Sequence, residues 1–277
     1  MVHDYGQIAP GDPCVHSDTL NDSMPDSLVT WALLCGSAFL GGAVNSIAGG
    51  GTLLTFPTLL SVLSPVLANA TSTLALVPGS LAGAWGYRRE LAECRHHLLR
   101  LWPPSLLGGI VGSLLVIRLP EKVFANLVPW LLVAASTLLL LQRPLQRWIG
   151  AHPHKPPTGA TVGVVVFFQF LVGVYGGYFG AGIGILMLSS LAFMGIPNIH
   201  QMNSIKTVLA ATINGITVVI FALAGVIVWK YAVAMAVTAM IGGYLGARVA
   251  RKMPVEYVRA IVVVIGFGVA AYSWFKR

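Results

Sequence analysis

The sequence predicts an all-α fold, a polytopic transmembrane helical bundle built from two homologous repeats. The 277 residues are 56% hydrophobic and only 9% charged, whereas a soluble domain carries roughly 25% charged residues. Long runs lack any Asp, Glu, Lys or Arg, and about 20 apolar residues suffice to cross a bilayer. These runs lie between Asp26 and Arg88 and at 101–117, 123–142, 156–205, 207–229, 231–247 and 260–275. They predict eight to ten membrane segments.

The ends of these runs divide the chain into four parts. Residues 1–27 are polar and hold all five aspartates but no Lys or Arg, so they lack the basic start and apolar core of a cleavable signal peptide. We expect them to form a flexible tail. Residues 28–142 are the first transmembrane repeat, 143–159 a basic linker loop, and 160–277 the second transmembrane repeat.

The net charge of +8 does not indicate nucleic-acid binding. Lys and Arg cluster in short loops between apolar runs, where they act as cytoplasmic topology signals. The bilayer is therefore the expected partner. Cys14, Cys35 and Cys94 lie in unrelated segments without metal-ligand spacing, so we expect no metal site, no disulfide framework and no cofactor.

The repeat appears when the sequence is compared with itself at the offset that aligns Gly50 with Gly184. Identical residues then recur without a gap from the first glycine cluster to a Leu-Pro or Met-Pro pair, as a duplication predicts. The further matched pairs include Asn69 with Asn203, Thr73 with Thr207, Gly108-Gly109 with Gly242-Gly243, and Pro120 with Pro254.

Each repeat contains a glycine cluster, at 45–51 and at 176–184. Consecutive glycines weaken a helix, and irregular backbone at membrane depth is tolerated only inside protein or beside a watery cavity. The clusters therefore predict broken helices, which in transporters commonly border the substrate between two repeats. The alternative is close helix packing through small residues, which we favour for Gly108-x3-Gly112 and Gly242-x3-Gly246.

The number of crossings decides how the repeats are oriented. Five crossings in each repeat would invert the second relative to the first and place the basic residues of 88–100, 143–155 and 248–259 on one side. Four crossings would leave the repeats parallel. We predict inverted repeats with both termini on the other side, because this keeps the basic loop at 248–259 inside.

Lys206 is the one Lys or Arg that lies away from loops and segment ends, and all nine acidic residues lie outside the apolar runs. A lysine in hydrocarbon costs at least a few kcal/mol unless it meets water, carbonyl groups or an anion. A bound anion would satisfy Lys206, although a lysine near a helix end could instead extend to the interface. The residue aligned with Lys206 in the first repeat is Ser72, and we expect the two to meet between the repeats.

Other polar and glycine residues near these positions complete the candidate substrate site. Amide, hydroxyl and backbone N–H groups donate to anionic oxygens, particularly at helix N-termini, although such residues are also ordinary helix caps. The candidates are Asn45, Gly49, Gly50, Asn69, Thr71, Gly180, Gly182, His200, Gln201, Asn203 and Thr207. Ser80 and Asn214 align and are interpreted as helix–helix hydrogen bonders, and Trp85, Tyr175, Tyr178 and Trp229 as wall or interface aromatics.

The main rival class is an intramembrane enzyme. The sequence has no His-Glu-x-x-His motif, no pair of membrane aspartates and no Gly-x-Ser-x-Gly turn. A channel remains an alternative, but it does not specifically predict a duplicated pair of broken helices.

Several of these segments together resemble the TauE/SafE family of sulfite exporters and related permeases. The resemblance rests on Gly-Gly-Ala-Val-Asn-Ser-Ile-Ala-Gly-Gly-Gly-Thr-Leu-Leu-Thr-Phe-Pro at 41–57, Ala-Asn-Ala-Thr-Ser at 68–72, Gly-Gly-Tyr-Phe-Gly-Ala-Gly-Ile-Gly at 176–184, Asn-Ser-Ile-Lys-Thr at 203–207 and Ile-Gly-Gly-Tyr-Leu-Gly-Ala at 241–247. It covers roughly residues 28–275.

The resemblance implies a helical permease of the bacterial inner membrane for a small anion such as sulfite, a sulfonate, sulfoacetate or thiosulfate. It implies neither the direction of transport nor the particular anion. The sequence leaves homodimer formation open. It departs from the expected pattern at Ser189-Ser190, where a proline comparable to Pro57 would be expected.

Overall fold

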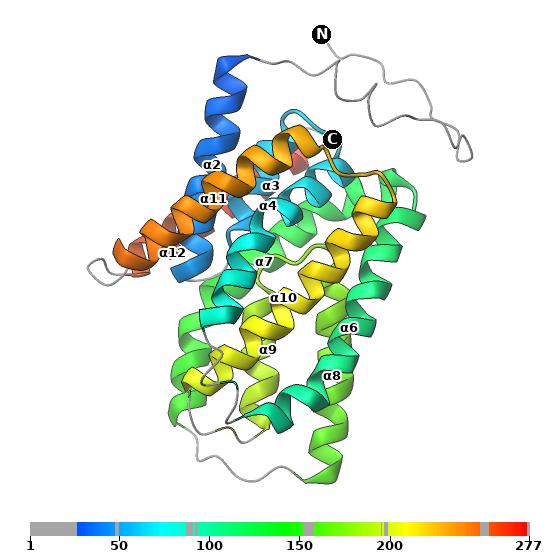
Figure 1. The fold of residues 1–277 in the computed structure, drawn as a ribbon, viewed down its shortest axis with the longest axis vertical. Helices are drawn as coiled ribbons and strands as arrows, with labels where there is room; N and C mark the ends of the chain where they lie inside the picture. The colour runs from blue at the N-terminus through cyan, green and yellow to red at the C-terminus, as the bar shows by residue number, and fades with distance from the viewer. Residues whose placement is uncertain are drawn as a thin grey trace.

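A computed structural model describes residues 27–47, 50–86, 91, 94–151, 158–194, 196, 199–249 and 255–275. These residues form ten helices and no strand (Figure 1). The helices are α2 (Leu28–Ile47), α3 (Thr52–Leu60), α4 (Pro65–Gly86), α6 (Arg95–Arg118), α7 (Glu121–Ala151), α8 (Gly159–Tyr178), α9 (Ile183–Phe193), α10 (Ile199–Leu223), α11 (Trp229–Val249) and α12 (Val255–Phe275). The tail predicted at 1–27 lies outside the described residues except for Ser27.

The order of helices repeats. Each set of five has a first long helix, a short helix and three more long helices. The last three of each set begin at residues that the repeat aligns: Pro65, Arg95 and Glu121 start α4, α6 and α7, and their counterparts Ile199, Trp229 and Val255 start α10, α11 and α12. The offset found in the sequence is therefore also the offset of the secondary structure.

The helices differ in whether they can cross a membrane. Five are long and apolar enough by length and composition, over residues 28–45, 95–118, 121–142, 159–178 and 201–223. The short α3 and α9 contain 9 and 11 residues, so at about 1.5 Å per residue they cover about half of the 30 Å hydrocarbon core. Each follows a glycine-rich interruption, which confirms the predicted broken helices. Residues 143–151 of the predicted linker loop are helical, because α7 continues to Ala151.

Two helix pairs come close enough for their backbones to touch, and both pairs join the repeats. In the α6–α8 pair, a Cβ atom at Gly108 would overlap the carbonyl oxygen of Phe170. In the α2–α11 pair, a Cβ atom at Gly42 would overlap the carbonyl oxygen of Ala239. Such contacts maximise dispersion between helices in a solvent that gives no hydrophobic driving force. The packing interpretation of the Gly108-x3-Gly112 segment is thus confirmed.

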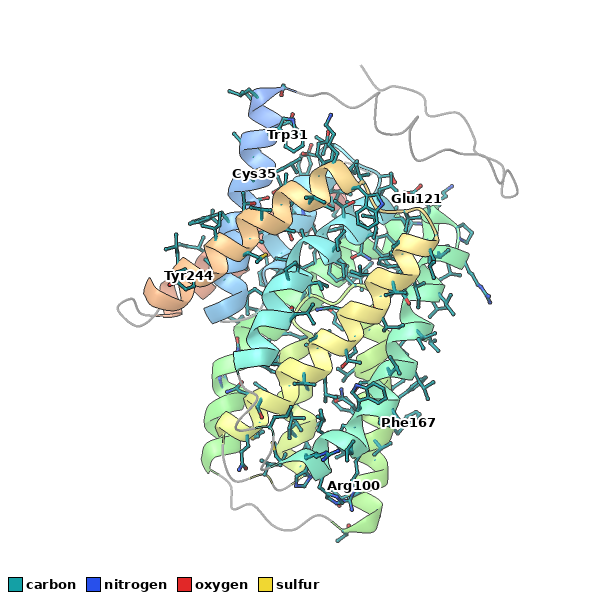
Figure 2. The ribbon with its side chains drawn as sticks, in the orientation of Figure 1. Trp31, Cys35, Arg100, Glu121, Phe167 and Tyr244 are labelled. Atoms are coloured by element: carbon teal, nitrogen blue, oxygen red, sulfur yellow. The ribbon has the colours of Figure 1, made fainter. Side chains whose placement is uncertain are left out.

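The outer surface of the bundle carries large apolar side chains. Phe167 of α8 and Tyr244 of α11 are both exposed and point outward in Figure 2. Exposed apolar residues on most of the long helices would be unfavourable in water, whereas lipid tails cover them without cost. The exposed surface is that of a membrane protein.

Candidate functional site

The first helix break joins α2 to α3 around Gly50, whose φ of 96° is in the left-handed region that favours glycine. The first turn of α3 then folds back onto α2, and a Cβ atom at Gly51 would overlap the carbonyl oxygen of Gly41. Asn45 lies beside this turn, with its Cβ 3.2 Å from the Cβ position of Gly51. Gly49 lies outside the described residues.

The second break joins α8 to α9 and contains two glycines in the left-handed region. Gly180 has φ 79° and Gly182, the N-cap of α9, has φ 77°. The hydroxyl of Tyr175 donates a hydrogen bond of 2.7 Å to the carbonyl oxygen of Ala181. Tyr175 therefore fixes the shape of the break, a role that the wall or interface interpretation missed because Ala181 gives no signal in the sequence.

Both breaks lie against the same stretch of α7. A Cβ atom at Gly50 would lie 3.4 Å from Leu139, and one at Gly182 would lie 3.6 Å from the carbonyl oxygen of Ala135. The rings of Phe56 in α3 and Phe179 in the second break pack edge to face with centroids 5.2 Å apart. The fold thus brings together two interruptions that are far apart in the sequence.

Asn69 of α4 reaches the second break. Its Nδ2 donates a hydrogen bond of 3.0 Å to the carbonyl oxygen of Tyr178, at the C-terminus of α8. The side chain is buried, and its Oδ1 has no hydrogen-bond partner among the described residues. Because a carbonyl only accepts, the amide nitrogen must face Tyr178, which fixes how Asn69 is oriented.

Lys206 of α10 lies along the first turn of α9. A Cβ atom at Gly184 would be 3.2 Å from Cδ of Lys206, so the absence of a side chain there leaves room for the lysine stem. The ammonium group donates a hydrogen bond of 2.9 Å to Oδ1 of Asn203. In the part of the chain that the structure describes, no carboxylate forms an ion pair with Lys206. Because Gly184 is in the first turn of α9, the stem that carries this positive charge lies beside the N-terminus of a half-length helix.

Ser72 does not pair with Lys206. The hydroxyl groups of Ser72 and Thr55 are 2.6 Å apart, so Ser72 faces α3, just as Lys206 faces α9. The two side chains, both described, share no hydrogen bond. The repeat thus places Ser72 and Lys206 in equivalent positions, each against the short helix of its own repeat. The expectation that they meet between the repeats finds no support in these contacts.

Three other candidates form hydrogen bonds within the protein, two of them inside α10 and one between α4 and the segment before α11. Thr207 donates to the carbonyl oxygen of Asn203 at 2.7 Å, and the carbonyl oxygen of Gln201 accepts from Ser204 at 2.8 Å. The hydroxyl of Thr71 accepts from the backbone N–H of Val228 at 3.2 Å, just before α11 begins. His200 lies in the first turn of α10, and its side chain is outside the described part of the structure.

Asn214 is also close to the second break. Its Oδ1 lies 3.7 Å from the position that a Cβ atom would take at Gly180. Ser80, its counterpart in the first repeat, donates to the carbonyl oxygen of Leu76 at 3.3 Å within its own helix. Three polar side chains therefore border the second break: Asn69 at Tyr178, Lys206 at Gly184 and Asn214 at Gly180.

A buried polar network near α9 was not predicted from the sequence. Nε2 of Gln169 donates to Ser105 at 2.9 Å, and the hydroxyl of Ser190 donates to Oε1 of Gln169 at 3.0 Å. All three side chains are buried. The network connects α6, α8 and α9, and it gives the Ser189-Ser190 departure a structural role. A glutamine within an otherwise apolar helix was the signal that could have revealed it.

The hydrogen bond from Tyr175 to the carbonyl of Ala181 leads to a stability prediction. We expect Tyr175→Phe to lower the stability of the purified protein by about 1–3 kcal/mol, because the buried carbonyl of Ala181 loses its donor. The matched control is Tyr178→Phe, since the Tyr178 hydroxyl is buried without a partner in the described structure, and it should leave stability unchanged or raise it. The stability of both variants is measured by heating the purified protein and determining by size-exclusion chromatography how much of it remains monodisperse. Equal stability of the two variants would contradict the assigned role of Tyr175.

Comparison with known proteins identifies the family. The profile described as "Sulfite exporter TauE/SafE" matches residues 34–273. A probable membrane transporter protein of Haemophilus influenzae is 27% identical over 242 residues, covering 87% of this chain and 92% of that protein. The probable membrane transporter proteins YfcA of Escherichia coli K12 and YunE of Bacillus subtilis are 27% and 25% identical, covering 90% and 86% of this chain and 91% and 96% of theirs.

No solved structure matches the chain. The family profile spans nearly the whole sequence, its relatives are described as transporters, and the helices have the length and composition of membrane spans. The resemblance seen in the glycine clusters and the Asn-Ser-Ile-Lys-Thr segment is confirmed. The chain belongs to the TauE/SafE sulfite exporter family and is a multi-pass membrane transporter, not an enzyme.

Proposed function

We propose that the protein carries a small anion, a sulfur oxyanion or an organosulfonate, by alternating access around a site between its two repeats. The observation that carries this proposal is Lys206, which is partly buried and is the one Lys, Arg, Asp or Glu of α10. Asn203 contributes a neutral oxygen and does not cancel the charge. A desolvated ammonium group without a counter-ion attracts an anion.

The N-terminus of α9 supports the same interpretation. No side chain caps this helix, whose N-cap is Gly182. The helix dipole gives such an end a partial positive charge. Because the stem of Lys206 passes along Gly184, the end of α9 and the ammonium group both contribute positive potential to the same region. The family description supports sulfite or a chemically similar ion as the proposed substrate.

The arrangement of the helices supports inverted repeats. In Figure 1, α2 begins at the top of the molecule and α8, its counterpart, begins at the bottom. Lys230 of α11 lies 5.7 Å from the ring centroid of Trp31, which Figure 2 labels near the top. Arg100, in the first turns of α6, is labelled near the bottom. Equivalent helices thus start at opposite ends, as alternating access by inverted repeats requires.

Inversion predicts where two equivalent positions can be labelled. His96 and Lys230 correspond to each other in the aligned repeats. Single cysteines at these positions, in a protein without its native cysteines, should react with an impermeant thiol reagent from opposite sides of the membrane. We expect the cysteine at 96 to react from the cytoplasm, because basic residues surround it. Labelling of both positions from one side would establish parallel repeats.

Transport itself is tested in proteoliposomes. The purified protein should accumulate at least one labelled anion from a panel of sulfite, thiosulfate, sulfoacetate, other sulfonates and carboxylates. Counterflow should be observed when the same unlabelled anion is inside, since a carrier exchanges its substrate. Transport of a cation or a neutral solute, with no anion bound or moved, would reject the proposal.

A further inference from the structure

The packing of the helices divides the molecule in a way that does not follow the two repeats. We call α2, α3, α4 and α11 unit A, and α6, α8, α9 and α10 unit B. Each unit contains three helices of one repeat and one helix of the other. Two features define both units, namely close backbone contacts and hydrogen bonds between helices. A hydrophobic core confined to unit B adds a third feature for that unit.

The close backbone contacts occur inside the units. In unit A, a Cβ atom at Gly242 of α11 would overlap the carbonyl oxygen of Phe39 of α2. In unit B, one at Gly112 of α6 would overlap the carbonyl oxygen of Val174 of α8. Helices whose backbones touch cannot slide past each other without steric overlap. Each pair therefore moves as one body.

All but one of the hydrogen bonds between helices described above follow the same division. Ser72 with Thr55 connects α3 to α4, and Thr71 connects α4 to the start of α11, both inside unit A. Inside unit B, Gln169 connects α6, α8 and α9. Trp102 of α6 also donates a hydrogen bond of 3.1 Å to Thr212 of α10.

The buried apolar side chains form two cores, and one of them lies in unit B alone. One core comes from unit B alone and includes Leu101, Val172, Leu188 and Leu209. The other combines buried residues of unit A, α7 and α12 with residues of unit B that face them, and the latter include Val116 of α6, Tyr178 of α8, Ile185 of α9 and Phe221 of α10. A core of its own is typical of a body that can move as one piece, and unit B has such a core.

The units meet mainly where α4 packs along α10, an interface about as extensive as that of α4 with α11. Two specific contacts also cross between the units: the Phe56–Phe179 ring contact and the hydrogen bond from Asn69 to the carbonyl of Tyr178. A hydrogen bond between membrane helices contributes only about 1 kcal/mol, so it can break and re-form in each cycle. It lies at the second break, beside the proposed anion site.

We infer that the transport cycle moves unit B against unit A, with the Asn69–Tyr178 hydrogen bond as the latch between them, and that the two repeats do not move as separate bodies. This inference rests on alternating access in the proposed function and adds which helices move together. Lys206 and α9 travel with α6, a helix of the other repeat. The stretch of α7 beside both breaks forms the surface along which the units separate.

Four exposed positions distinguish movement of the units from movement of the repeats. Leu33 of α2 and Leu107 of α6 belong to the first repeat, and Phe167 of α8 and Val237 of α11 belong to the second; all four are exposed. Spin labels are placed in pairs on protein whose native cysteines are replaced, and distances are measured in nanodiscs with and without sulfite. Exposed sites on the lipid-facing surface tolerate the label without disturbing the core.

The two views predict opposite results. If the units move, the pairs 33–107 and 167–237 give broad or shifted distance distributions, whereas 33–237 and 107–167 stay narrow. If the repeats move, 33–237 and 107–167 change instead. That second pattern overturns the inference, as does the absence of change in every pair, because the units would then form one rigid body. The distances are measured whether or not an anion is transported, so failure of the proposed function is recognised separately.

Cross-linking connects the movement to transport. The ring pairs Trp31–Tyr231 and Phe56–Phe179 both have centroids 5.2 Å apart and both join the two repeats, but only the second joins the two units. Each pair is replaced by cysteines and cross-linked, and transport is compared with that of the same protein after reduction. A cross-link that prevents gating stops the cycle, so only the 56–179 link should abolish transport. Inhibition by the 31–231 link contradicts the inference.

Discussion

Lys206→Ala protein is expected to bind its anion at least about 100-fold more weakly than the unsubstituted protein while remaining monodisperse. A hydrogen bond to a charged group contributes about 1.5–3 kcal/mol, and more when the site is desolvated. Removing Lys206 leaves no buried carboxylate behind, because the described membrane helices give it none. The loss should therefore appear in binding and not in folding. Isothermal titration or a thermal-shift assay with the transported anion measures it.

Three further substitutions separate the charge from the shape. Lys206→Met keeps an unbranched stem along Gly184 and should fail to bind as completely as Lys206→Ala. Lys206→Glu should be at least as inactive. Lys206→Arg is expected to bind weakly, since a planar guanidinium differs from a compact ammonium group. Lys230→Ala is the matched control, because this lysine lies at the start of α11 against Trp31, and it should bind normally. Normal binding by Lys206→Ala would show that Lys206 only anchors the helix at the interface.

Gly108→Ala is expected to destabilise the protein by about 2 kcal/mol or more, the cost of forcing a methyl group into a close-packed interface. The new Cβ atom would overlap the backbone of α8 at Phe170, and neither helix can shift without disturbing the other contacts of its unit. We expect the melting temperature in detergent to fall and the protein to aggregate earlier on heating. Gly242→Ala, at the equivalent position of the α2–α11 pair, should have a similar effect.

The control for this prediction lies in the same helix pair. No atom lies within 4 Å of the position that a Cβ atom would take at Gly163 of α8. Gly163→Ala therefore meets nothing and gains the helix propensity of alanine, worth up to about 1 kcal/mol. A loss of stability for Gly163→Ala as large as for Gly108→Ala would show that glycine flexibility, and not close helix packing, is what α6 and α8 require.

The elements that repeat along the sequence could be predicted from it. The single offset that aligns the repeats gives the starts of α10, α11 and α12 from those of α4, α6 and α7, because duplicated segments fold alike. The glycine clusters predicted the two breaks, because few other residues tolerate a positive φ. These features depend on interactions between residues that are close together in the chain, and such interactions can be predicted from a single sequence.

The partners of the polar residues could not be predicted. Ser72 was expected to meet Lys206 but bonds to Thr55. Thr71, a candidate for the substrate site, bonds to Val228, a partner that the sequence did not indicate. Both outcomes depend on how a short helix folds back and on which helix of the other repeat packs beside it. The periodicity of the sequence does not contain that information, since every apolar helix offers several faces of similar hydrophobicity.

The exchange of helices between repeats also constrains how the protein is made. Its first long helix, α2, enters the membrane early, yet the helix whose backbone it contacts is α11, which leaves the ribosome after most of the chain. Until then the part of α2 at Gly42 lacks the helix that packs against it. Native assembly must therefore wait until translation is nearly complete, and a chain that stops after the first repeat lacks the surface needed to bury Gly42. Quality control that recognises unpaired membrane helices would act on such a fragment, and supplying the second repeat as a separate chain should restore assembly.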